Sequence, residues 1–74
     1  QMNKVKVVIY TDRFRYSFDF GNGEVKIFSY EDFTSYIYSK PLSEDFFETH
    51  ARTDDFTSKG EKAFEEIIKI FNET

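Results

Sequence analysis

The sequence of 74 residues contains no cysteine and no tryptophan, and it has one histidine and one proline. Without cysteine, the chain can form no disulfide bond, no thiolate zinc site and no cysteine nucleophile. A chain this short forms one domain, and small domains without disulfides or metals are usually short of hydrophobic core. Another source of buried surface is therefore required.

Long apolar runs are missing as well. Near the N-terminus the longest is Val7–Tyr10, which is too short for a signal-peptide core or a membrane span. Because the lack of cysteine also suits a reducing compartment, we expect a cytoplasmic protein. Met2 is the expected natural start and Gln1 a residue left from expression, so a single domain is predicted over 2–74.

Aromatic side chains are abundant: ten Phe and five Tyr make up 20% of the chain. Aromatic residues bury large areas, so they can supply the core that small domains lack. Four of them alternate with other residues over 14–20, which is the period of a β-strand. Apolar residues also alternate over 4–10, and a third run covers 24–30, so three strands are predicted.

The connections between these runs predict an antiparallel meander. Asn22-Gly23 suits a type I′ hairpin turn, in which both central residues have positive φ, and Asp12-Arg13 is the expected first turn. The resulting pairs are Phe20 with Val25, Phe18 with Ile27 and Tyr16 with Ser29 in the second hairpin, and Ile9 with Tyr16, Val7 with Phe18 and Val5 with Phe20 in the first. All three strands then bury one shared face.

The C-terminal half is predicted to be helical. Residues 33–39 are assigned to a helix that a proline ends, with a fourth strand over Thr34–Tyr38 as the alternative. Ser43 is the expected cap of a short second helix, and Ser58 opens a capping box that predicts a helix over 59–72. The predicted fold class is therefore α+β: a three-stranded antiparallel meander packed against two or three C-terminal helices.

Charge is distributed unevenly along the chain. Residues 1–30 carry five basic and three acidic side chains, whereas residues 31–74 carry five basic and eleven acidic ones. Uncompensated acidic groups repel one another, so a partner with a positively charged surface is one reason to keep them, and solubility is the alternative. The residues predicted to bind this partner are Glu44, Asp45, Glu48, Asp54 and Asp55.

The face of the sheet opposite the core is a second candidate surface. The predicted register places Arg15 between the rings of Tyr10 and Tyr30, and Phe28 lies on the same face. Basic residues among aromatic ones are typical of surfaces that stack single-stranded nucleic acid, but the net charge of −4 opposes phosphate binding. The alternative partner-binding set is therefore Tyr10, Arg15, Phe28 and Tyr30, with another protein or a second copy as the partner.

Residues suited to catalysis are scarce. His50 is the only histidine and no serine lies in a nucleophile motif, so we expect a surface or partly buried side chain there. His50 and Asp54 are spaced to share one helical face, but two ligands without a recognised spacing do not define a metal site. Gly21-Asn22-Gly23 connects two strands, whereas a phosphate loop leads into a helix. We predict no enzymatic activity, no metal and no cofactor.

In size, acidity and lack of catalytic groups, the chain resembles the small acidic inhibitors encoded by phages and mobile elements. These include anti-CRISPR and anti-restriction proteins, some of which mimic DNA. The resemblance rests on composition and carries no site residues with it. It implies a non-enzymatic inhibitor that blocks a basic nucleic-acid-handling protein, with carboxylates in place of phosphates. Neither direct nucleic-acid binding nor membrane binding is expected, and a homodimer is compatible with the sequence.

Overall fold

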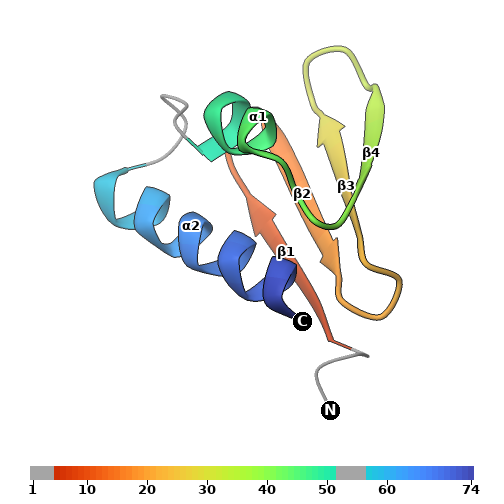
Figure 1. The fold of residues 1–74 in the computed structure, drawn as a ribbon. Coiled ribbons are helices and arrows are strands. Elements are labelled where there is room, and N and C mark those ends of the chain that lie inside the picture. Colours follow the sequence, from red (N-terminus) through yellow and green to blue (C-terminus); the bar gives the residue numbers. More distant parts are fainter. Residues whose placement is uncertain (1–4, 52–56) are drawn as a thin grey trace.

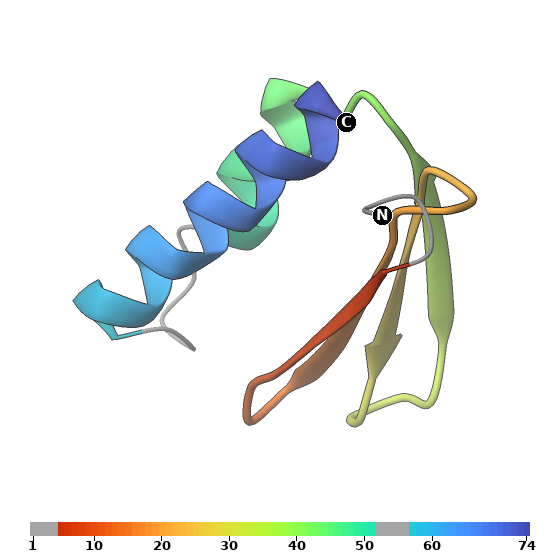
Figure 2. The same cartoon turned by 90° about the horizontal axis from the view of Figure 1, so that it is seen from below.

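The computed structural model describes residues 5–51 and 57–74, which form an α+β fold. A four-stranded antiparallel sheet in the order β1-β2-β3-β4 carries helices on one face (Figure 1). Figure 2 shows the helices and the sheet as two separate layers. The elements in chain order are β1 (Lys6–Tyr10), β2 (Phe14–Asp19), β3 (Glu24–Ser29), β4 (Ser35–Ser39), α1 (Glu44–Phe46), the π-helix η2 (Phe47–Ala51) and α2 (Ser58–Glu73). The predicted class is confirmed, and the predicted count of three strands is wrong.

The first hairpin has the register expected from the sequence. The observed pairs include Ile9 with Tyr16 and Val7 with Phe18. Asp12 and Arg13 form the turn, which is closed where the Thr11 N–H donates to the Phe14 carbonyl at 2.8 Å. The Thr11 hydroxyl also accepts from the Phe14 N–H at 2.9 Å, so this side chain holds both strands at the turn.

The second hairpin is displaced by two residues from the predicted register. The observed pairs are Phe18 with Val25, Tyr16 with Ile27 and Phe14 with Ser29. A displacement of two keeps every side chain on its predicted face, because side chains alternate with period two. The core prediction for the aromatic strand therefore survives the error.

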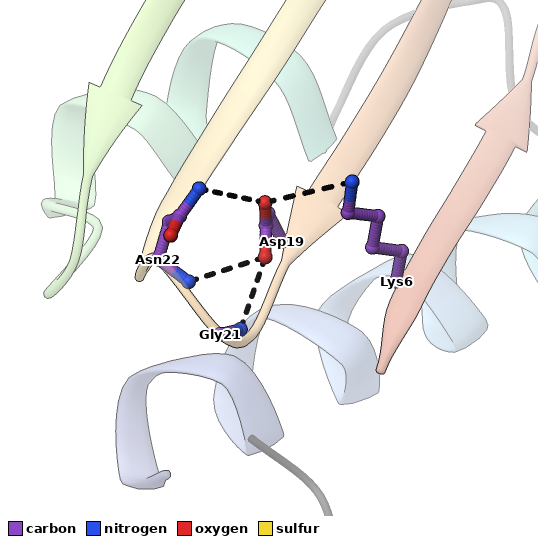
Figure 3. Close-up of polar contacts among 4 residues, drawn as sticks. All are labelled: Lys6, Asp19, Gly21 and Asn22. Atoms are coloured by element: carbon purple, nitrogen blue, oxygen red, sulfur yellow. Dashed lines mark hydrogen bonds and ion pairs between the residues drawn. The ribbon is translucent and has the colours of Figure 1, made fainter. Parts of the chain in front are cut away.

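The cause of the displacement is the turn, which is not type I′. Of its residues only Gly23 has a positive φ, of 67°, and its N–H donates to the Asp19 carbonyl at 2.9 Å. The Asp19 carboxylate accepts from the backbone N–H groups of Gly21 and Asn22 at 3.0 and 3.1 Å, and Lys6 Nζ lies 3.9 Å from its other oxygen (Figure 3). These bonds favour a four-residue loop over the predicted two-residue turn.

The helix predicted over 33–39 is wrong, and the alternative fourth strand is confirmed. Val25 of β3 pairs with Tyr38 of β4, and Ile27 pairs with Tyr36. A run of β-branched and aromatic residues has a strand preference, and the adjacent edge of β3 offers it backbone partners. Pairing with β3 therefore decides between helix and strand for residues 33–39. Helix-capping signals are local and carry no information about this pairing.

The core lies between the sheet and the helices. Its fully or nearly buried side chains are Tyr16, Phe18, Phe20, Val25, Ile27, Leu42, Phe46, Phe64, Ile68 and Phe71. Phe64 and Phe71 of α2 meet Phe18 edge to face, with ring centroids 5.8 and 5.6 Å away, an arrangement that aromatic pairs prefer. Large rings from both layers therefore fill the interior, as the composition predicts.

Helix ends and one polar clamp fix the helical layer. Ser43 caps α1 as predicted, accepting from the Phe46 N–H, whereas Thr57 and not Ser58 caps α2. The side chain of Asn72 accepts from the Leu42 N–H at 2.6 Å and donates to the Leu42 carbonyl at 3.2 Å. This clamp holds the segment after β4 against α2. Within the described residues, no helix combines the length and apolar character needed to cross a membrane.

Candidate protein-binding surfaces

Three of the predicted acidic residues form one exposed surface. Glu44 and Asp45 lie in α1 and Glu48 in η2, and all three are exposed. None of their carboxylates makes a hydrogen bond or ion pair with another side chain of the described chain. Asp54 and Asp55 lie outside the described residues. The carboxylates of Glu44, Asp45 and Glu48 are therefore accessible to a cationic partner.

The β3–β4 loop lies at the same end of the sheet as α1 (Figure 1), and its sequence contains two further acidic residues. Glu31 and Asp32 line a hollow of about 300 Å³ together with Thr49 and His50 of η2. The Thr34 hydroxyl donates to Asp32 at 2.7 Å, and this bond lowers the pKa of the Asp32 carboxyl. Asp32 therefore stays ionised, and it adds to the negative charge of the helical surface.

His50 is buried at the base of this hollow, against the expectation of a surface or partly buried side chain. It is 8% exposed, and the rings of Tyr16, Tyr38 and Phe46 surround it with centroids 5.7, 5.9 and 4.7 Å away. Among the residues that the structure describes, its Nε2 has no hydrogen-bond partner. Burial lowers the pKa of His50, because the charged form is disfavoured away from water. The residue acts as a neutral core ring.

The outer face of the sheet carries the alternative set of candidate residues, but their cross-strand pairing differs from the predicted one. Arg15 pairs with Tyr10 on one side and with Phe28, not Tyr30, on the other. The Arg15 guanidinium carbon lies 5.1 Å from the centroid of the Phe28 ring, within cation–π distance. Tyr30 remains close, because its ring centroid is 5.5 Å from that of Phe28. All four candidate residues thus belong to one surface.

Sequence reasoning missed Phe33, which it assigned to a helix. Phe33 lies in the β3–β4 loop with φ of 57°, and it is the one residue other than glycine with a positive φ in the described chain. Its side chain is 76% exposed, and its ring lies 6.3 Å from that of Phe28. The preceding polar residues Tyr30, Glu31 and Asp32 are the signal that could have placed it in a turn.

The whole of β4 is also exposed, which the sequence did not predict. Tyr36, Ile37 and Tyr38 are 48%, 58% and 37% exposed, and the strand lies at the edge of the sheet. Tyr38 reaches the helical layer, with its ring 5.1 Å from that of Phe46, and Tyr36 lines the same hollow as Thr49 and His50. Exposed apolar surface of this extent is typical of interaction sites.

The chain shows neither a metal-binding cluster among its described residues nor a similarity to a known family. The described part of the chain contains no group of three or more His, Asp or Glu side chains that could hold a metal ion. No protein-family model matches the sequence, and searches of curated proteins and of solved structures returned no significant match. Arguments about function therefore rest on the geometry of these surfaces.

Proposed function

We propose that this protein is a non-enzymatic inhibitor or adaptor that binds a basic surface of another protein. Its binding surface comprises the exposed carboxylates of α1 and η2 and those of the β3–β4 loop, and it extends through this loop to the ring of Phe33, which lies beside Phe28 of the outer face. The single observation that carries the proposal is Phe33, an exposed aromatic side chain held at positive φ beside two carboxylates.

The backbone conformation of Phe33 is costly in the absence of a partner. A residue with a Cβ loses about 1–2 kcal/mol in the left-handed region relative to its preferred conformations. The corresponding residue of the β2–β3 loop is Gly23, because the N–H groups of both residues donate to the carbonyl four residues earlier, and glycine adopts this conformation without that penalty. Strained residues cluster at functional sites, so an aromatic residue at this position supports a role in binding.

The chemistry of the surface matches a cationic partner. Carboxylates accept charge-assisted hydrogen bonds from Arg and Lys, and an aromatic ring attracts the same cations through its face. Exposed aromatic anchors surrounded by charge are also typical of interface hot spots. A nucleic-acid-handling protein of the kind blocked by anti-CRISPR or anti-restriction inhibitors offers such a basic surface, and the carboxylates would then occupy its phosphate sites.

Affinity capture with matched charge variants tests the proposal. The bait Asp45→Lys/Glu48→Lys reverses two carboxylates of the binding surface, and Glu66→Lys/Glu73→Lys makes the same change in net charge on exposed positions of α2. We expect the first to lose the partner recovered from a bacterial lysate by the unaltered protein, and the second to retain it. Equal binding by all three baits, insensitive to salt, would contradict the proposal.

Phe33→Ala tests the aromatic part of the same surface. As a hot-spot residue, Phe33 should contribute at least about 2 kcal/mol, so the affinity for the recovered partner should fall about thirtyfold. Tyr10→Ala, on the distant part of the outer face, is the control. If Tyr10→Ala and Phe28→Ala weaken binding while Phe33→Ala does not, the alternative surface of Tyr10, Arg15, Phe28 and Tyr30 is the binding site.

A further inference from the structure

β4 leaves one row of backbone hydrogen-bonding groups unpaired. The Ser29 N–H donates to the Thr34 carbonyl at 2.9 Å, and the Lys40 N–H donates to the Gly23 carbonyl at 2.9 Å. Hydrogen-bonded pairs alternate along an antiparallel ladder, so every second residue between these two bonds faces β3. The backbone groups of Ser35, Ile37 and Ser39 therefore face away from the sheet. In the described chain, no other strand lies on that side of β4.

This edge has none of the usual protection against pairing. Native edge strands are commonly blunted by a charged residue, a proline or a bulge. β4 contains none of these, and all five of its residues are exposed. Figure 2 shows that it also lies at the side of the sheet farthest from α2. The edge is thus available to a further β-strand.

The sequence of β4 fits one particular strand, which is a second copy of itself. Ser-Tyr-Ile-Tyr-Ser is the same in both directions about Ile37. An antiparallel pair centred on Ile37 places Ser35 of each copy opposite Ser39 of the other, and every outward-facing backbone group then finds a partner. Tyr36 of each copy lies opposite Tyr38 of the other, and aromatic cross-strand pairs stabilise sheets.

The flanking charges are complementary in the same arrangement. Glu31 and Asp32 precede β4, and Lys40 follows it. Antiparallel pairing brings the acidic end of one strand to the basic end of the other, twice in each dimer. Lys40 makes no ion pair with another residue of the described chain, so it is available for this contact.

We propose that two copies of this chain pair through β4, antiparallel and about a twofold axis at Ile37, to form one continuous eight-stranded sheet. A twofold contact uses the same edge on both copies, so it closes at the dimer. The interface is centred on the backbone of β4 and shares only Glu31 and Asp32 with the acidic surface of the proposed function, so it stands whether or not a basic partner is found.

Paired substitutions at Ser35 and Ser39 test both the dimer and its register, with sedimentation equilibrium as the measurement. Ser35→Lys/Ser39→Lys places two pairs of like charges across the axis, and it should raise the dimer dissociation constant about tenfold or more. Ser35→Glu/Ser39→Lys carries the same change at 39 but opposes unlike charges, so it should dimerise at least as well as the unaltered chain. Circular dichroism establishes that both variants are folded.

Amide hydrogen exchange gives a second, residue-specific test. As the concentration rises, the N–H groups of Ser35, Ile37 and Ser39 should become protected, while those of Tyr36 and Tyr38 should change little because β3 already pairs them. A monomer at millimolar concentration, assemblies larger than a dimer, or equal dimerisation of the two double variants would overturn the proposal. So would a dimer in which these three amides stay unprotected.

Discussion

β1 and β4 are the two edges of one sheet, but three of the five residues of β1 are exposed whereas all five residues of β4 are. Val7 and Ile9 of β1 are half-buried and pack on the core that α2 completes. Its solvent-facing side carries Lys6, which pairs with Asp19 of β2. β4 carries no charge, and its apolar side chains Tyr36 and Ile37 are about half exposed.

The two edges therefore differ in role: β1 contributes to the stability of the fold, and β4 is available for recognition. Apolar area removed from water stabilises the fold at one edge, whereas at the other edge similar side chains remain in water. A charged residue on β1 also opposes pairing with another chain, and its absence from β4 leaves that edge competent to bind. The three predictions that follow separate these two roles, beginning with the largest expected effect.

Matched threonine substitutions on the two edges should differ in their effect on stability. Val7→Thr puts a hydroxyl against the core and should lower the free energy of unfolding by about 1–2 kcal/mol. Ile37→Thr, at an exposed position, should change it by no more than about 0.5 kcal/mol. Urea unfolding at a concentration where the chain is monomeric provides the measurement. Equal losses at both sites would show that β4 contributes as much to the fold as β1.

Substitutions at the two loop residues with positive φ, Phe33 and Gly23, should have opposite effects on stability. Phe33→Gly relieves the left-handed strain and should raise the free energy of unfolding by about 0.5–1 kcal/mol, although it removes the proposed binding ring. Gly23→Ala should lower it by about 1–2 kcal/mol, since its new Cβ would also lie 3.2 Å from side-chain carbons of Lys40. Thermal unfolding tests both, and a destabilised Phe33→Gly variant would assign Phe33 a structural role.

Mild acid should lower the stability of the fold through His50, whose ring lies 5.9 Å from that of Tyr38 in β4. The pKa of His50 is lowered by folding, so between that value and the ordinary histidine pKa of about 6.5 the unfolded chain binds more protons. Its contribution to stability is complete above about 6.5 and is lost as the pH falls through this window. Unfolding at pH 7.5 and 5.5 should show this loss of stability, which His50→Phe should abolish. Arg13, Glu31 and Asp32 line the same hollow as His50.

Much of the sheet was predictable from the sequence because its signals are local. Aromatic alternation over 14–20 identified the central strand, and the two-residue turn at Asp12-Arg13 gave the correct register for β1. The error at Asn22-Gly23 arose because the Asp19 side chain, which precedes the turn, competes for the turn's N–H groups. Period-two alternation made that error harmless for the core.

The candidate surfaces were less predictable. The acidic positions Glu44, Asp45 and Glu48 are exposed as expected, since charged side chains rarely lose their water. The strained Phe33 and the bare edge of β4 were missed together, because both depend on residues 33–39 joining the sheet. Residues 33–39 join the sheet because the edge of β3 is unpaired, and the local sequence around residue 36 carries no information about that edge.

By itself, then, the sequence determined the α+β class, the buried face of the first three strands, the C-terminal helix and the uneven charge. Each of these follows from side-chain periodicity or composition, which need no knowledge of distant segments. Only the tertiary structure decided the fourth strand, the burial of His50 among rings and the partner of Arg15 across the outer face. These depend on which segments meet in space, and pairing between strands far apart in sequence sets that outcome.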